Sequence, residues 1–245
     1  MLMNENYLTD LLLKMGIELN KRQACQFLDY YKLLVEWNEK INLTAITDFD
    51  EVCLKHFADS VSLIRMFSSS EELNSFLSGK TLADIGTGAG FPGIPLKILC
   101  PDLKVTLFDS LDKRIRFLDT VIGCLNLEGI EAVHGRAEDL ARNDYRESFD
   151  ISTARAVAAL PVLCEYCLPF VKTGGLFIAY KSDVSEELNS SAKALEVLGG
   201  KIVQRETFTL PESDISRTIL FFEKVKSTPD TYPRKAGKPS KQPLI

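Results

Sequence analysis

The residues best suited to chemistry lie in one glycine-rich turn and in an acidic residue that follows it. The turn contains the pattern G-x-G-x-x-G beginning at Gly88, and Asp109 stands 21 residues further on, after the next apolar run. Glycines let a ligand approach the backbone closely, and an acid at that distance can accept hydrogen bonds from ribose hydroxyls. The spacing predicts a nucleoside site. A P-loop is excluded because Ile94 follows the last glycine where a lysine would be needed.

The residues around the turn favour S-adenosylmethionine over a dinucleotide. A dinucleotide needs free backbone amides at the start of the following helix, and Pro92 and Pro95 remove two of them. S-adenosylmethionine carries no phosphate and tolerates that loss. Asp84 precedes the turn, where its carboxylate would brace loop amides or receive the methionine ammonium, but would repel a pyrophosphate.

No side chain stands out as a catalytic base, nucleophile or metal ligand. Cys164 and Cys167 are spaced like two ligands, but the chain has only two histidines and neither is near them in sequence. The pair therefore predicts two buried cysteines on one helix, and no metal site is expected. We leave the catalytic residues unassigned, since a methyl transfer that depends on alignment alone needs none.

Two kinds of element must position these residues. Residues 1–78 show apolar stripes at helical spacing, and a helix after Asp48 or Asp50 as N-cap is one of them. From residue 80 short strands alternate with helices, which predicts a parallel sheet covered on both faces. Two final strand-like runs have no helix between them and should pair antiparallel. The predicted strands cover 80–86, 104–109, 130–135, 149–155, 175–181, 201–210 and 216–225.

We therefore expect an α/β fold of the class I methyltransferase type, Rossmann-like, with a mostly parallel sheet and an antiparallel last strand. Three regions are predicted, namely an N-terminal helical extension (1–78), a methyltransferase domain (79–226) and a basic, proline-containing tail (227–245) on or near the active site. The tail itself is expected to be irregular and to lie on the surface.

Charge is distributed unevenly along the 245 residues. The net charge is −5, yet residues 224–245 carry +5, so the rest of the chain carries −10. Such asymmetry indicates either a local contact with a polyanion or a solvated tail. Six scattered cysteines, no apolar run of membrane-spanning length and no signal peptide favour a protein of the cytoplasm.

Longer motifs carry a more specific resemblance. The segments DIGTGAGFPGIPLKI, DSLDKRIRFL, GRAED, TARAVAAL, AYKS and YPRKAGKPSKQPL, together with WNEKINLTAI and HFADS, resemble the glucose-inhibited division protein B family in order and spacing. The resemblance runs from about Trp37 to Leu244, with Ser182 departing from the glycine common in that family. It implies methyl transfer from S-adenosylmethionine to N7 of a guanine in 16S ribosomal RNA, within the small subunit or an assembly intermediate.

The resemblance also implies site residues. With Asp109 from the spacing argument, the cofactor contacts are expected at Gly86, Phe91, Asp109, Ala137, Glu138 and Arg155. Arg155 is expected to clamp either the methionine carboxylate or an RNA phosphate. The basic residues expected to contact RNA are Lys181, Arg234, Lys235, Lys238 and Lys241.

Three other functions fit parts of the sequence. A small-molecule methyltransferase would share the turn, and a non-catalytic RNA-binding assembly factor would share the fold and the tail. A nicotinamide-dependent dehydrogenase fits the glycine pattern but not the two prolines or the final antiparallel pair. The target nucleotide and the oligomeric state do not follow from the residues.

Overall fold

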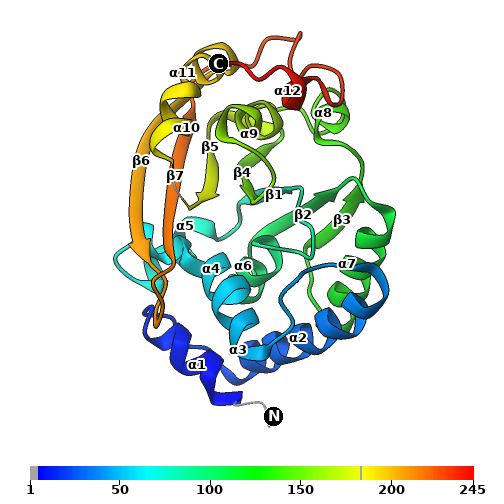
Figure 1. Ribbon diagram of the computed structural model, residues 1–245, viewed down its shortest axis with the longest axis vertical. Coiled ribbons are helices and arrows are strands. Elements are labelled where there is room, and N and C mark those ends of the chain that lie inside the picture. Colours follow the sequence, from blue (N-terminus) through cyan, green and yellow to red (C-terminus); the bar gives the residue numbers. More distant parts are fainter. Residues whose placement is uncertain (1–4, 183) are drawn as a thin grey trace.

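A seven-stranded sheet in the order β3-β2-β1-β4-β5-β7-β6 forms the centre of the computed structural model, which describes residues 5–182 and 184–245 (Figure 1). The strands β1 to β5 are parallel, and β7 lies antiparallel between β5 and β6. The predicted α/β fold with an antiparallel last strand is confirmed. The strands are β1 (Thr81–Ile85), β2 (Lys104–Asp109), β3 (Ile130–His134), β4 (Phe149–Arg155), β5 (Val171–Lys181), β6 (Gly200–Thr209) and β7 (Ser216–Lys224).

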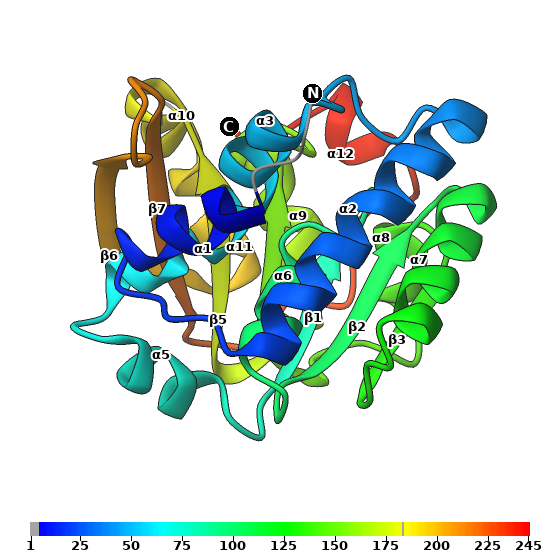
Figure 2. The same ribbon diagram turned by 90° about the horizontal axis from the view of Figure 1, so that it is seen from below.

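Helices cover both faces of the sheet (Figure 2). None in the described part of the chain is long and apolar enough to cross a membrane. Alternate strand residues point to opposite faces, so Leu82 packs into one hydrophobic cluster and Ala83 into the other. The first cluster is shared with α1 (Glu5–Leu13), α2 (Lys21–Ile41), α3 (Phe49–Val52), α4 (Asp59–Val61), α5 (Ser70–Leu77), α6 (Gly93–Leu99) and α7 (Asp112–Cys124). The second includes residues of α9 (Leu160–Cys167) and α11 (Ala192–Leu198), with α8 (Ala137–Leu140) and α10 (Ser185–Ser190) nearby.

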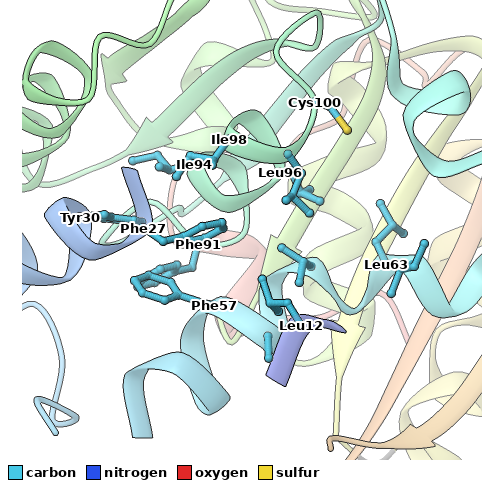
Figure 3. Close-up of a cluster of buried hydrophobic side chains, with 14 of the residues drawn as sticks. Leu12, Phe27, Tyr30, Phe57, Leu63, Phe91, Ile94, Leu96, Ile98 and Cys100 are labelled. Carbon is cyan, nitrogen blue, oxygen red and sulfur yellow. The ribbon is translucent and has the colours of Figure 1, made fainter. Parts of the chain in front are cut away.

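The N-terminal helices support the glycine turn directly. Buried residues of α2 and of the segment after α3 meet Phe91 of the turn in one aromatic cluster (Figure 3). The Tyr30 ring lies 5.4 Å from the rings of both Phe57 and Phe91, and its hydroxyl donates a hydrogen bond to the Ala89 carbonyl. We call the helical segments from α1 to α5 the N-terminal layer; it packs over the turn through α2 and the segment after α3. The helical spacing of apolar residues gave no signal for Tyr30, whose role here depends on its hydroxyl.

A helical run from α3 to residue 66 contains a π-helical turn. Asp48 caps its start by accepting a hydrogen bond from the Glu51 amide at 3.1 Å, as one of the two predicted caps. A π-helix over Cys53–Ala58 follows, then α4 and a 3-10 turn over Ser62–Met66. Single π-turns occur frequently at functional sites because they re-aim side chains. Here the π-turn carries His56, and α4 begins with Asp59.

The tail is not irregular throughout, which corrects the sequence expectation. It contains the short helix α12 (Lys238–Lys241) and buries Pro233, Pro239 and Leu244. The tail lies beside α9 and α8 (Figure 1). Because the prolines and Leu244 supply apolar surface, the segment packs against the rest of the chain, and the solvated tail that was one of the two interpretations of its charge is not seen.

Candidate active site

Asp84 holds the glycine turn to the end of β1. Its Oδ2 atom accepts hydrogen bonds from the Thr87 hydroxyl at 2.7 Å and from the Gly93 amide at 2.9 Å. Burial raises the pKa of Asp84 to about 6, against the lowering effect of these two hydrogen bonds. The predicted bracing role is confirmed. Because Gly93 begins α6, the carboxylate also occupies an amide that a dinucleotide phosphate would need.

The last two glycines of the turn serve packing and not ligand approach, which corrects their interpretation. A Cβ atom on Gly93 would lie 2.5 Å from Leu107 Cδ2, and one on Gly90 would lie 2.7 Å from the Tyr30 hydroxyl. Helix α6 and the N-terminal layer therefore require these glycines. Gly88 differs, because a Cβ atom there would meet nothing within 4 Å.

A cavity of about 210 Å³ opens at the carboxyl ends of β1, β2 and β4. We call it the cofactor cavity. At Gly86, which has a φ of +67°, a Cβ atom would come within 2.9 Å of Val157 Cγ2, so the cavity floor needs glycine. Four of the six predicted cofactor residues come together here. The lining includes Gly86, Asp109, Gly135, Ala137, Glu138, Tyr166 and Ser240.

Asp109 is fixed at the rim of the cofactor cavity by three donors. Its carboxylate accepts hydrogen bonds from the amides of Gly88 at 3.0 Å and Leu111 at 2.9 Å, and from Arg114 Nη1 at 3.0 Å. It lies at the end of β2, where open α/β sheets bind ribose. A fixed acid, a glycine floor and a second carboxylate from Glu138 fit the adenosine part of S-adenosylmethionine.

Phe91 and Arg155 lie outside the cofactor cavity. The buried ring of Phe91 stacks on His56, with ring centres 4.8 Å apart, and the Arg155 guanidinium lies 5.0 Å from its centre. Phe91 therefore supports neighbouring side chains, and no contact with the cofactor cavity is seen. Arg155 lines a second hollow on the other side of the loop after β4.

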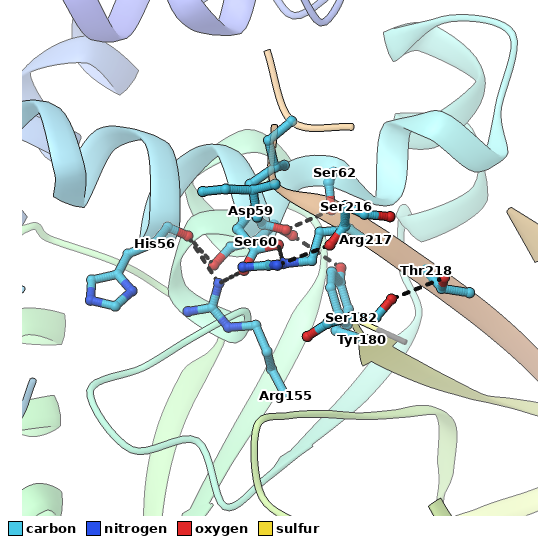
Figure 4. A network of polar contacts seen from close by, with 12 residues as sticks. His56, Asp59, Ser60, Ser62, Arg155, Tyr180, Ser182, Ser216, Arg217 and Thr218 are labelled. Atoms are coloured by element: carbon cyan, nitrogen blue, oxygen red, sulfur yellow. Dashed lines mark hydrogen bonds and ion pairs between the residues drawn. The ribbon is translucent and has the colours of Figure 1, made fainter. Parts of the chain in front are cut away.

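This second hollow, of about 370 Å³, is lined mainly by charged and polar side chains, and we call it the basic cavity. At its centre Asp59 binds two arginines (Figure 4). Arg155 Nη1 lies 3.1 Å from Asp59 Oδ2, and Arg217 Nε lies 2.9 Å from Oδ1. The lining includes Lys55, His56, Asp59, Arg155, Ala156, Lys181, Glu187 and Arg217.

Residues 156–158 separate the two cavities. Ala156 lines the basic cavity, while Val157 and Ala158 line the cofactor cavity. Ala156 has a φ of +57°, a conformation that residues other than glycine adopt rarely and that clusters at functional sites. Lys181 holds this partition, because its Nζ donates to the Ala158 carbonyl at 3.2 Å and pairs with Glu187 at 2.7 Å.

His56 is held neutral in the basic cavity. Burial and the nearby Arg155 charge lower its pKa to about 4. Its Nε2 atom shares a hydrogen bond with the Thr44 hydroxyl at 2.9 Å. It lies in the π-helical turn and is bonded to the segment between α2 and α3.

The predicted RNA contacts divide into buried and exposed groups. The Arg234 guanidinium binds the fully buried Glu165, with Nη2 2.6 Å from Oε2 and Nε 2.9 Å from Oε1. It is therefore a structural ion pair, contrary to the expected phosphate contact. Lys181 is largely buried beside Glu187. The remaining lysines, 235, 238 and 241, are exposed.

The cysteine pair is structural as predicted. Cys164 and Cys167 are fully buried on α9. Across residues 5–182 and 184–245 no three histidine, cysteine or acidic side chains gather as a metal-binding group.

The strand order, the braced turn and the cofactor cavity define a class I S-adenosylmethionine-dependent methyltransferase. Solved structures support this fold. A mutant of MtNAS matches with a TM-score of 0.54 at 16% identity, covering 83% of this chain and 76% of that one. A chain of the Haloferax volcanii complex that contains the Trm112 methyltransferase activator matches with a TM-score of 0.53 at 12% identity, covering 79% of this chain and 98% of that one.

Sequence comparisons narrow the class to one family. The GidB family, described as rRNA small subunit methyltransferase G, matches residues 23–216, and the chain belongs to it. Ribosomal RNA small subunit methyltransferase G of Lachnoclostridium phytofermentans is 56% identical, covering 94% of this chain and 93% of that protein. The Lactobacillus johnsonii protein of the same name is 49% identical, covering 99% of this chain and 100% of that protein. The family resemblance is thereby confirmed, and S-adenosylmethionine is the cofactor of this class.

Proposed function

We propose that this protein transfers a methyl group from S-adenosylmethionine to N7 of a guanine in the 16S RNA of the small ribosomal subunit. The family supports the ribosomal substrate. The observation that carries the proposal is the basic cavity beside the cofactor cavity, with only residues 156–158 between them. A base held in the basic cavity would meet the methyl group at the edge of this partition, because in-line transfer needs N7 within about 3 Å of the methyl carbon.

The cofactor would be held by the residues that line its cavity. Asp109 accepts hydrogen bonds at the ribose, Glu138 and the Ala137 amide read the adenine edge, and Gly86 forms the floor. When bound, S-adenosylmethionine supplies an electrophilic methyl group on a sulfonium. The chain must then exclude water and align the acceptor with that methyl.

The acceptor needs no general base. Guanine N7 presents a lone pair and carries no proton, so a nucleophile in line with the methyl suffices. His56, with its lowered pKa and its Thr44 hydrogen bond, is not placed to remove a proton. Positioning of the base is therefore the contribution we assign to the basic cavity.

Guanine offers acceptors at O6 and N7 and donors at N1 and N2. Lys181 and Arg217 line the cavity as donors for O6, while Glu187, 2.7 Å from Lys181, lines it as an acceptor for the neighbouring N1–H. Such a contact set would leave N7 free for the methyl group. Adenine lacks O6 and carries an amine in its place, so it would meet Lys181 donor to donor.

RNA backbone contacts are assigned to the exposed lysines of the tail and not to Arg234. Lys235, Lys238 and Lys241 offer three charges beside the cofactor cavity, whereas the body of the chain is acidic. Binding to naked RNA is expected to be weak and to fall steeply with salt. The substrate is therefore proposed to be a ribosomal particle or assembly intermediate in the cytoplasm.

The test is transfer of labelled methyl to small subunits from a strain that lacks the enzyme. Label in 16S RNA, at a position that reduction and aniline cleave, would support N7 methylation of guanine. Lys181→Met should lower transfer more than tenfold, because it removes the O6 donor and frees the partition. Lys172→Met is the matched control, since Lys172 is half exposed and pairs with Asp150 at the opposite end of the sheet. Cofactor binding without label in RNA would contradict the proposal and point to a small-molecule acceptor.

A further inference from the structure

The C-terminal tail closes one side of the cofactor cavity. Ser240, on α12, lines that cavity together with Tyr166 of α9. The Ser240 and Tyr166 hydroxyls share a hydrogen bond at 2.7 Å. A residue near the end of the chain therefore forms part of a site that the sheet alone does not complete.

The tail also fixes one of the cofactor-facing carboxylates. The Gly237 amide donates a hydrogen bond to Glu138 Oε1 at 2.8 Å. Glu138, on α8, is 4% exposed and lines the same cavity. Because one oxygen is held by the tail, the orientation of the other depends on where the tail lies.

Several strong contacts anchor the tail in this position. Beyond its guanidinium contacts with Glu165, Arg234 donates its backbone amide to Oε1 at 2.7 Å. Arg142 Nε donates to the Pro233 carbonyl at 2.7 Å, and Arg146 Nη1 donates to the Tyr232 carbonyl at 2.8 Å. A solvated tail would show none of these buried contacts.

We propose that residues 232–244 are a wall of the cofactor site, and that RNA and cofactor binding are coupled through this wall. The exposed Lys235, Lys238 and Lys241 alternate along the segment with Gly237 and Ser240, which face the site. RNA bound to these lysines stabilises the tail in its packed position, and a bound cofactor does the same from inside. Coupling of this kind is reciprocal. The coupling rests on the proposed RNA substrate, whereas the wall does not.

The wall is tested with the full chain and without RNA. Isothermal titration measures the Kd of S-adenosylhomocysteine for Ser240→Phe, which places a ring in the cavity, and for Tyr166→Phe, which removes the shared hydrogen bond. We expect weakening of about tenfold or more for Ser240→Phe and about two- to fivefold for Tyr166→Phe. Thr231→Phe adds a ring at an exposed position that precedes the proposed wall and lies outside the cavity lining, and it should leave Kd within about twofold. Unchanged Kd values in both cavity variants, with melting temperatures near wild type, would contradict the proposal that the tail forms a wall of the cofactor site.

The coupling is tested separately by binding to small subunits. In the wild type, saturating S-adenosylhomocysteine should tighten subunit binding by about fivefold or more, and Ser240→Phe should abolish this gain. Wild-type binding that does not respond to the cofactor would overturn the coupling. Failure to bind subunits under any condition would contradict the proposed substrate instead. The titrations without RNA would still show whether the tail forms a wall of the cofactor site.

Discussion

Replacing Asp59 by Asn tests whether the basic cavity is held together by one buried carboxylate. Asp59 lies on α4, Arg155 ends β4 and Arg217 lies on β7, so the two ion pairs join three elements. The carboxylate side chain is 5% exposed, and the arginine side chains are 11% and 21% exposed. Asn keeps the shape but removes the charge and presents an amide donor to one of the guanidinium groups.

The magnitude follows from the two short contacts. At about 3 Å and an effective dielectric constant of about 20, each pair gains roughly 5 kcal/mol of Coulomb energy. Desolvation offsets most of this, and removal of one partner from a buried ion pair costs about 3–5 kcal/mol. Because both arginines retain some solvent, we expect a loss of about 3 kcal/mol in the free energy of unfolding. For a chain of this size that corresponds to a decrease in Tm of about 6–12 °C.

The assay is urea unfolding at neutral pH, in single and double variants. Asp59→Asn should cost less, about 1–2 kcal/mol, in an Arg217→Met background, because only Arg155 then lacks its partner. Asp112→Asn, whose exposed carboxylate pairs with Arg116, should cost less than about 0.5 kcal/mol. A loss below about 1 kcal/mol for Asp59→Asn, or strict additivity in the double variant, would refute this account of the network.

Three further predictions concern other buried ionisable groups. Arg234→Ala leaves Glu165 buried without its guanidinium and should cost about 3–5 kcal/mol by urea unfolding; Lys235→Ala next to it is exposed and should change stability by less than about 0.5 kcal/mol. The Asp84 pKa of about 6 lies above its ordinary 3.8, so this group stabilises the fold as pH falls from 6 toward 4. The free energy of unfolding of Asp84→Asn should not show that gain at low pH. If its pH dependence equals that of the wild type, the raised pKa of Asp84 is contradicted. The His56 pKa of about 4 lies below its ordinary 6.5, so stability is lost as pH falls from 6.5 toward 4. His56→Gln should remove this loss, and NMR titration of wild-type His56 near 6.5 would disprove its burial in the neutral form.

The fold could be predicted largely because several of the strands contain a short apolar run. Both faces of a parallel sheet are buried, so the apolar residues of β1, β2 and β4 allowed these strands to be predicted from the sequence. The start of β5 was placed at residue 175, whereas the strand begins at Val171. Its first residues include Lys172, Thr173 and two glycines, which together have the composition of a turn.

The cofactor cavity was predictable for a related reason. Gly86, Asp109 and Glu138 follow the carboxyl ends of consecutive strands, and the topology of the fold brings those ends to one edge. Spacing along the chain thus becomes proximity in space. The same argument gave no signal for Tyr166 and Ser240, because neither follows a strand of the parallel sheet.

The basic cavity was less accessible to sequence reasoning. Asp59 and Arg217 are 158 residues apart, and no periodicity or motif spacing connects them. HFADS resembled a family segment, but the resemblance assigned no role to its aspartate. The tail was difficult to interpret for a different reason. Arg234 lies in a basic segment whose lysines are exposed, and the sequence does not distinguish it from them. Only its packing against the buried Glu165 distinguishes it.

The two cavities therefore depend on different parts of the chain. The cofactor cavity is built from the strand ends of a sheet shared by the whole class, whereas the basic cavity takes Lys55, His56 and Asp59 from the N-terminal helical layer. That layer is tied to the sheet at the cavity itself, since the Tyr180 hydroxyl donates to the Ser60 carbonyl at 3.0 Å beside the two Asp59 ion pairs. A reaction without a general base gains its rate from alignment, and alignment requires that the wall holding the acceptor cannot shift relative to the wall holding the cofactor. The N-terminal layer thus forms one side of the basic cavity, and its fixed position relative to the sheet is what the proposed alignment requires.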